Sequence, residues 1–84
     1  MSQTKKVAIY TTPTCTYCRM AKEMFREHSI TYEEYDVLAD LKRREEMVNK
    51  SGQMGVPVIT VAGDGREEVI VGFDQRRLTK LLEI

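Results

Sequence analysis

The stretch Pro13-Thr14-Cys15-Thr16-Tyr17-Cys18 decides how this 84-residue chain is interpreted, because it contains both cysteines, separated by two residues. It follows the apolar run Val7-Ala8-Ile9-Tyr10 and leads into a run with helical periodicity. A CxxC pair at such a strand-to-helix turn is typical of a thiol–disulfide redox site. Pro13 ends the strand, because proline cannot donate to a central strand ladder and disfavours helix at the preceding residue.

Hydrophobic patterning around this stretch predicts four strands and three helices. The first strand is continuously apolar, as in a buried strand, whereas the second carries charges that are typical of a sheet edge. The run Gly63-Asp64-Gly65-Arg66 predicts a hairpin turn, Ser51-Gly52 a helix stop, and Asp74 a helix N-cap. The predicted strands are residues 5–11, 31–37, 58–62 and 67–71, and the predicted helices are residues 17–29, 40–50 and 74–82.

The predicted order is β-α-β-α-β-β-α, which gives one α/β domain over residues 1–84 with a four-stranded mixed sheet and helices on both faces. The first βαβ unit must be parallel and right-handed, and the last two strands form an antiparallel hairpin. Residues 42–46 are expected to form a solvated helix face with ion pairs. The helix residues expected to face inward are Ala21, Met24, Phe25 and His28, flanked by Tyr17 and Met20, then Leu41, Met47 and Val48, then Leu78, Leu81 and Leu82.

The composition argues against several functions. Thirteen basic and thirteen acidic side chains give a net charge of zero, so nucleic acid is not the expected partner. No apolar run approaches the ~20 residues of a membrane-spanning helix, and residues 1–6 lack the apolar segment of a secretory signal. We therefore expect a cytoplasmic monomer. In that reducing compartment a cysteine pair is more often catalytic or metal-binding than a structural staple.

The position of the cysteines suggests how they divide the chemistry. The nucleophile in disulfide exchange is the thiolate, and the start of a helix lowers a cysteine pKa through its unpaired N–H groups and its dipole. Cys15 lies where the predicted helix begins, and Cys18 lies one turn later and deeper. We therefore expect Cys15 to attack a disulfide and Cys18 to resolve the product.

Two other interpretations of the cysteine pair were weighed. Free cysteines are often inert core residues, but the spacing and the strand-to-helix position argue against that. A structural zinc site needs four ligands, and His28 lies about two to three helical turns further on, too far to share a metal with Cys15 and Cys18. His28 is better interpreted as a residue that favours the helix dipole at the C-terminal end, and no metal site is predicted.

Three motifs make the chain resemble the glutaredoxins, small bacterial or archaeal members of the thioredoxin-fold superfamily, over nearly its whole length. They are the run from Tyr10 to Cys18, then Gly55-Val56-Pro57, then Val71-Gly72-Phe73-Asp74, in the family's order and at its usual distances. The resemblance implies a thioredoxin-like fold and a thiol–disulfide oxidoreductase that reduces protein disulfides or glutathione mixed disulfides. No tightly bound cofactor is implied, and glutathione is the expected co-substrate.

The resemblance also implies a substrate groove beside Cys15 and Cys18. Val56-Pro57 corresponds to the family's cis-proline loop, in which the Val56 backbone pairs with the cysteine of bound glutathione or peptide. A plain strand-start proline is the alternative for Pro57, as a plain N-cap is for Asp74. The residues expected to line the groove are Thr12, Tyr17, Val56, Pro57, Gly72, Phe73, Asp74 and Gln75.

The chain departs from the family pattern at three positions, and these leave the electron source open. Thr12 stands where a carboxylate-binding lysine is common, Thr16 where proline is common, and Gln75 where a second aspartate is common. Recharging by a thioredoxin-reductase-like flavoenzyme instead of glutathione is therefore an alternative. Two further alternatives are a glutaredoxin module that holds a [2Fe–2S] cluster between two chains and a scaffold with vestigial thiols.

Overall fold

The seven predicted elements are all present in the computed structural model, which describes residues 5–84. Residues 1–4 lie outside the described part, as does most of the segment judged for a secretory signal. Each element begins and ends within two residues of its prediction. In chain order they are β1 (Lys6–Thr11), α1 (Thr16–Glu27), β2 (Tyr32–Asp36), α2 (Leu41–Ser51), β3 (Val58–Gly63), β4 (Arg66–Val71) and α3 (Gln75–Leu82).

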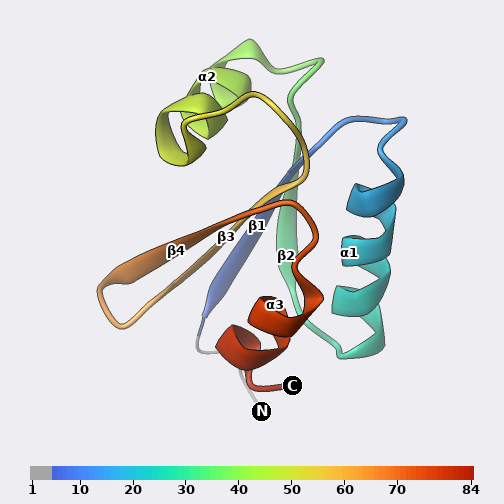
Figure 1. Ribbon diagram of the computed structural model, residues 1–84, viewed down its shortest axis with the longest axis vertical. Coiled ribbons are helices and arrows are strands. Elements are labelled where there is room, and N and C mark those ends of the chain that lie inside the picture. Colours follow the sequence, from blue (N-terminus) through green and yellow to red (C-terminus); the bar gives the residue numbers. More distant parts are fainter. Residues whose placement is uncertain (1–4) are drawn as a thin grey trace.

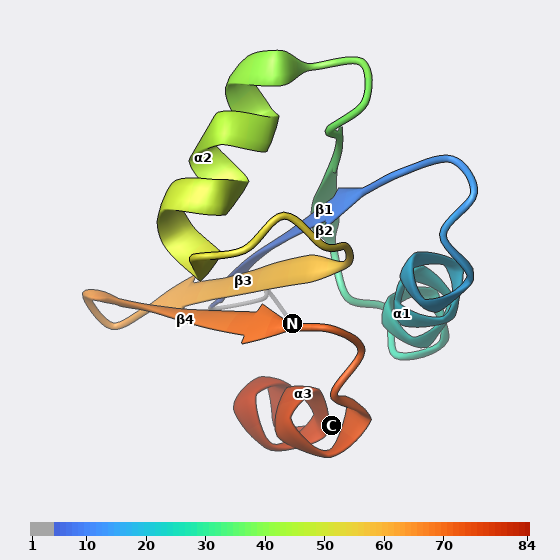
Figure 2. The same ribbon diagram turned by 45° about the horizontal axis from the view of Figure 1, so that its top comes forward.

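The strands form one mixed sheet in the order β2-β1-β3-β4. β1 and β2 are parallel, as the first βαβ unit requires, whereas β3 is antiparallel to both β1 and β4. The charged strand β2 lies at an edge, which confirms the prediction. Figures 1 and 2 show α2 on one face of the sheet and both α1 and α3 on the other, so helices cover both faces.

The larger core lies between the sheet and the pair α1 and α3. Alternation along β1 directs Val7 and Ile9 to this face and Tyr10 to the opposite one. Phe25 of α1 is fully buried and its ring lies 5.3 Å from that of Tyr32. The buried members of this cluster are Val7, Ile9, Ala21, Met24, Phe25, Ile59, Val61, Ile70 and Leu78.

The α2 face of the sheet has a smaller apolar cluster, formed by Tyr10, Val37, Met47 and Val58, and a polar network beside it. The buried Tyr10 hydroxyl donates to Glu46 at 2.5 Å. Glu46 also accepts both hydrogen bonds of one Arg43 guanidinium nitrogen at 3.2 Å. The predicted ion pair is therefore present between Arg43 and Glu46, and Glu46 additionally accepts the hydroxyl of the buried Tyr10, a contact that the sequence did not predict.

Several side chains predicted to face inward are exposed. Tyr17 is 61% and Met20 43% exposed, because each lies one residue, or about 100° of helix rotation, from the buried row of α1. His28 is exposed because it is the C-cap, beyond the last turn that packs on the sheet. Leu41 is 69% exposed as the first residue of α2. The inward positions of Ala21, Met24, Phe25, Met47 and Leu78 are confirmed.

Turn and cap residues end the elements as their chemistry predicts. The β3–β4 turn is the two-residue pair Asp64-Gly65, both at positive φ (54° and 75°), which is the backbone of a tight hairpin turn. Gly52 ends α2 in the left-handed conformation, and Asp74 caps α3 by accepting from the Arg77 N–H at 3.1 Å. Within residues 5–84, none of the helices has the length and hydrophobicity to cross a membrane.

Candidate active site

Cys15 occupies the N-cap position of α1, with an extended backbone (φ −82°, ψ 112°). Its Sγ accepts a hydrogen bond from the backbone N–H of Cys18 at 3.1 Å. The first turn of a helix has N–H groups without partners inside the helix, and these groups attract negatively charged atoms. A cysteine in this position therefore presents its sulfur to the end of the helix that best accommodates a thiolate.

The turn before α1 holds Cys15 in this position. The N–H of Cys15 donates to the carbonyl of Thr12 at 3.3 Å, and the carbonyl of Cys15 accepts from Arg19 in the first helical turn at 3.2 Å. Pro13 and Thr14 lie between them at the exposed tip of the turn. Cys15 itself is partly exposed, so a substrate disulfide can reach its sulfur.

Cys18 is the buried member of the pair, at 1% exposure. Both cysteines are free thiols. Burial raises the pKa of the Cys18 thiol to about 12, and its hydrogen bond with Cys15 adds to that rise. The structure therefore distinguishes the two thiols: Cys15 is accessible to a substrate, whereas Cys18 is buried.

The Val56–Pro57 peptide bond is cis, as the resemblance implied. Pro57 is buried and Val56 is half-buried, and β3 begins at the next residue. Strand register brings this loop to the cysteines' end of the sheet, because Val58 pairs with Tyr10 near the end of β1 and with Val71 at the end of β4. Figures 1 and 2 show the turn before α1, the loop before β3 and the turn before α3 on one side of the molecule.

The segment from Gly72 to Gln75 is joined to the cis-proline loop by a backbone hydrogen bond. The N–H of Gly72 donates to the carbonyl of Pro57 at 2.8 Å. Gly72 has φ +82°, a conformation that a residue with a Cβ rarely adopts. Phe73 packs against the larger core, whereas Asp74 and Gln75 are exposed. Asp74 serves as the N-cap of α3, one of the two roles considered for it.

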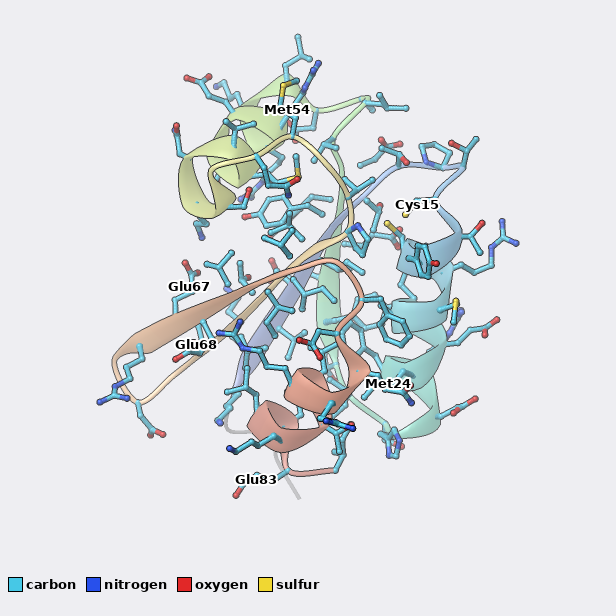
Figure 3. The ribbon with its side chains drawn as sticks, viewed as in Figure 1. Cys15, Met24, Met54, Glu67, Glu68 and Glu83 are labelled. Atoms are coloured by element: carbon cyan, nitrogen blue, oxygen red, sulfur yellow. The ribbon has the colours of Figure 1, made fainter. Side chains whose placement is uncertain are left out.

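Thr12 and Tyr17 flank the cysteines differently. Thr12 is half-buried, and its carbonyl accepts the hydrogen bond from the Cys15 N–H. The side chain of Tyr17 is exposed to solvent. Met54 precedes the cis-proline loop and is 60% exposed. Figure 3 shows Met54 and Cys15 at the same end of the molecule. Met54 was not predicted as a site residue, because an exposed methionine in a loop carries no periodic signal.

Sequence reasoning also missed a polar cluster behind the cysteines, formed by Thr11, Lys22 and Glu34. Lys22 Nζ contacts Glu34 Oε2 at 2.7 Å, and the Thr11 hydroxyl donates to the same oxygen at 3.1 Å. Two signals could have located it: Lys22 lies four residues after Cys18 on the helix, and Glu34 shares a strand face with the inward-facing Tyr32.

Metal-binding residues do not gather elsewhere in the described structure. Among residues 5–84, no three Cys, His, Asp or Glu side chains lie close enough together to hold a metal ion.

Comparison with known proteins agrees with this arrangement. A sequence profile of the Glutaredoxin family matches residues 7–66. An uncharacterized glutaredoxin-like 8.6 kDa protein in the rubredoxin operon of Clostridium pasteurianum is 42% identical over 77 residues, which cover 92% of this chain and 97% of that protein. Glutaredoxin 3 of Escherichia coli K12 is 36% identical over 55 residues, 66% of each chain.

Solved structures give the same result for the fold. The crystal structure of the thioredoxin-like protein BC3987 superposes with a TM-score of 0.77 at 35% identity, covering 92% of this chain and all of that one. The glutaredoxin of Archaeoglobus fulgidus superposes with a TM-score of 0.77 at 20% identity, covering 94% of this chain and 87% of that one. With its CxxC pair at the start of α1, this chain belongs to the glutaredoxin family and has the thioredoxin-like fold.

Proposed function

We propose that this protein is a dithiol thiol–disulfide oxidoreductase that reduces protein disulfides or glutathione mixed disulfides. One observation carries the proposal: Cys15 is a partly exposed N-cap whose sulfur accepts the N–H of Cys18, while Cys18 lies buried one turn further into α1. The membership in the glutaredoxin family supports the same general activity. We infer that it acts in the cytoplasm as a monomer without a tightly bound cofactor.

The reaction proceeds in two exchanges. The Cys15 thiolate attacks one sulfur of the substrate disulfide, forms a mixed disulfide and releases the other sulfur as a thiolate, which takes a proton from solvent. Cys18 then loses its proton and attacks the Cys15 sulfur. The second substrate thiol leaves, and a Cys15–Cys18 disulfide remains. Two electrons from the reductant restore the dithiol, either from two glutathione molecules or from a flavin-dependent reductase.

The groove around Cys15 would hold the substrate by its backbone. In this proposal the Val56 backbone pairs with the cysteine of bound glutathione or peptide, while Thr12 and Tyr17 form one wall. Gly72, Phe73, Asp74 and Gln75 form the far end, where N–H groups in the first turn of α3 can donate hydrogen bonds to a carboxylate. The hydrogen bond between Gly72 and Pro57 supports this arrangement, because it joins two of the three segments.

Replacing each cysteine with serine tests the activity. Cys15→Ser should abolish disulfide reduction, because the attacking sulfur is lost. Cys18→Ser should retain the first exchange and accumulate a mixed disulfide at Cys15, which mass spectrometry detects. A fully active Cys15→Ser protein would overturn the proposal.

A coupled assay separates the two electron sources. The purified protein is first oxidised to its Cys15–Cys18 disulfide. One assay then supplies glutathione, glutathione reductase and NADPH, and the other supplies thioredoxin reductase and NADPH. We propose glutathione as the reductant, and the likeness to a thioredoxin-like protein keeps the flavoenzyme as the alternative. If the protein turns over with thioredoxin reductase and not with glutathione, the alternative is correct. The departures from the family pattern at Thr12, Thr16 and Gln75 would then be consistent with that reductant.

A further inference from the structure

The cluster of Thr11, Lys22 and Glu34 lies on the same face of the sheet as α1, at the end of β1 that leads into the turn before Cys15. Thr11 is 2% exposed and is the last residue of β1. Glu34 of β2 accepts from both the Thr11 hydroxyl and the Lys22 ammonium at one oxygen, Oε2. The Lys22 side chain is 24% exposed. Its ammonium contacts Glu34 of β2, and Thr11 of β1 anchors that carboxylate in turn.

Lys22 is placed to act on Cys18. It follows Cys18 by four residues on α1, so the two side chains project from the same side of the helix on successive turns. Hydrogen bonding to the Thr12 backbone and, to a smaller extent, the positive charge of Lys22 oppose the rise that burial imposes on the pKa of Cys18. Thr11, which anchors Glu34, is followed directly by Thr12, whose backbone hydrogen-bonds the Cys18 thiol.

We propose that Lys22 is a positioning residue for the second exchange: its ammonium, paired with the Glu34 carboxylate that Thr11 anchors, stabilises the Cys18 thiolate that attacks the mixed disulfide. This inference rests on the proposed function and names a residue that the cysteine motif does not contain. A buried thiol otherwise reacts slowly, since only its thiolate is a nucleophile. A fixed cation one turn away increases the thiolate fraction without exposing the sulfur.

The step is balanced as follows. The Cys18 thiol gives its proton to water, and its sulfur forms a bond to the Cys15 sulfur. The bond between Cys15 and the substrate sulfur breaks, and the substrate leaves as a thiolate with that electron pair. Lys22 remains protonated throughout, so its contribution is electrostatic.

The other ionisable groups on this face come from α1 and from the strands and helix that surround it. On α1 itself Cys15 faces Cys18 and raises its pKa, in the opposite direction to Lys22. The inward-facing residues of β1 and β3 are Thr11 and aliphatic side chains. β2 contributes Tyr32, Glu34 and Asp36, and the Asp36 carboxylate accepts from the backbone N–H of Leu38. β4 contributes Arg66 and Glu68, and Glu68 pairs with Arg77 of α3 at 3.0 Å. Lys22 is therefore the cation whose removal should affect Cys18 most.

The test separates the two exchanges with one equivalent of 5,5′-dithiobis(2-nitrobenzoate), a coloured aromatic disulfide. Attack by Cys15 releases the first thionitrobenzoate in a concentration-dependent phase, and attack by Cys18 releases the second in a concentration-independent phase. Lys22→Met should slow the second phase roughly three- to tenfold at neutral pH and move its pH profile about 0.5–1 unit higher. The first phase should stay within about twofold of wild type.

Three further variants decide the interpretation. Lys22→Arg should restore most of the second-phase rate, because it keeps the charge. Lys22→Met with Glu34→Gln should remain slow; full recovery would mean that an unpaired carboxylate, not the lost ammonium, caused the defect, and would overturn the inference. Lys6→Met is the matched control, because Lys6 pairs with Glu33 on the opposite face of β2 at 3.6 Å, and it should behave as wild type.

The two possible failures are distinguishable. If wild-type protein shows no first phase, the proposed function fails. If the first phase is normal and Lys22→Met leaves the rate and pH profile of the second phase unchanged, the inference about Lys22 is wrong while the function stands. Circular dichroism of each variant shows that it is folded, which is expected for a partly exposed position on one helix.

Discussion

The two faces of the sheet are built from different interactions. Under α1 and α3 lies a continuous apolar cluster, centred on side chains such as Phe25 and Ile59 that are fully buried. Under α2 the apolar cluster is smaller, and the buried Tyr10 sends its hydroxyl out to a charged pair, Glu46 and Arg43. Arg43 in turn lies 4.0 Å from the centre of the Tyr35 ring.

The α1 and α3 face is stabilised mainly by apolar packing, whereas the α2 face also contains charged side chains. The face with the larger core carries α1, whose N-terminal end holds both cysteines, so the reactive thiols stand on the best-packed part of the molecule. On the α2 face a small apolar cluster around Met47 is supplemented by partly exposed charged contacts, such as Lys50–Glu67 between α2 and β4, which depend on pH and on salt. Replacements on the first face should therefore act on folding as a whole, and replacements on the second should have smaller and pH-dependent effects.

The largest expected effect is on the α1 face. Phe25→Ala should lower the free energy of unfolding by roughly 3–5 kcal/mol, because it leaves a cavity in the core and removes the ring contact with Tyr32. A domain of this size has a total stability of roughly 3–5 kcal/mol, so the variant should be largely unfolded. Urea denaturation followed by circular dichroism measures this. Leu41→Ala, at an exposed position on α2, is the control and should change stability by less than about 0.5 kcal/mol.

The next effect is on the α2 face. Tyr10→Phe removes the hydroxyl that donates to Glu46 but keeps the ring in place. We expect a loss of about 1 kcal/mol, less than for a buried charged hydrogen bond, because the Glu46 side chain is 36% exposed. Denaturant midpoints measure it. Tyr17→Phe is the matched control, since its ring is exposed, and a loss as large as that of Tyr10→Phe would contradict the contrast between them.

The pH dependence of stability sharpens the same comparison. The hydrogen bond from Tyr10, followed by the nearby Arg43 and Lys50 charges, lowers the pKa of Glu46 despite some desolvation. A carboxyl with a lowered folded-state pKa contributes stability above its unfolded pKa of about 4.3 and loses it as the pH falls through the lower folded value. Glu46→Gln should therefore be less stable than wild type at neutral pH, and the two should converge below about pH 4. A constant difference across pH would exclude this role of Glu46.

The smallest expected effects are the coupling energies of two ion pairs on opposite faces of β2. Glu34 and Glu33 are adjacent on β2 and each pairs with a lysine, but Lys22–Glu34 is shorter and less exposed than Lys6–Glu33. A double-mutant cycle should give a coupling of about 0.5 kcal/mol for Lys22–Glu34. The Lys6–Glu33 cycle should show no measurable coupling. Equal couplings would mean that the anchoring by Thr11 adds nothing.

Sequence reasoning reached the fold because local signals agreed with one another. The apolar first strand, the charged edge strand, the Asp64-Gly65 turn, the Gly52 stop and the Asp74 cap are each set by a few neighbouring residues, and the structure confirms all of them. The exposed positions of Tyr17, Met20 and Leu41 were not predictable in this way. An apolar residue at the margin of a helical stripe is buried only if a neighbouring element covers it, and the sequence does not state how far that cover extends.

For the site, the sequence by itself determined the two thiols and their order along α1, because the spacing of a CxxC pair at a helix start is a local property. The cis bond before Pro57 came from resemblance to a family, since an isolated X-Pro sequence does not fix the isomer. Only the tertiary structure decided what surrounds the thiols. Strand register joins Pro57 to Gly72, and the packing of α1 on β1 and β2 places Lys22, Glu34 and Thr11 behind Cys18. Such contacts between distant residues depend on how the elements pack, and no short stretch of the chain encodes them.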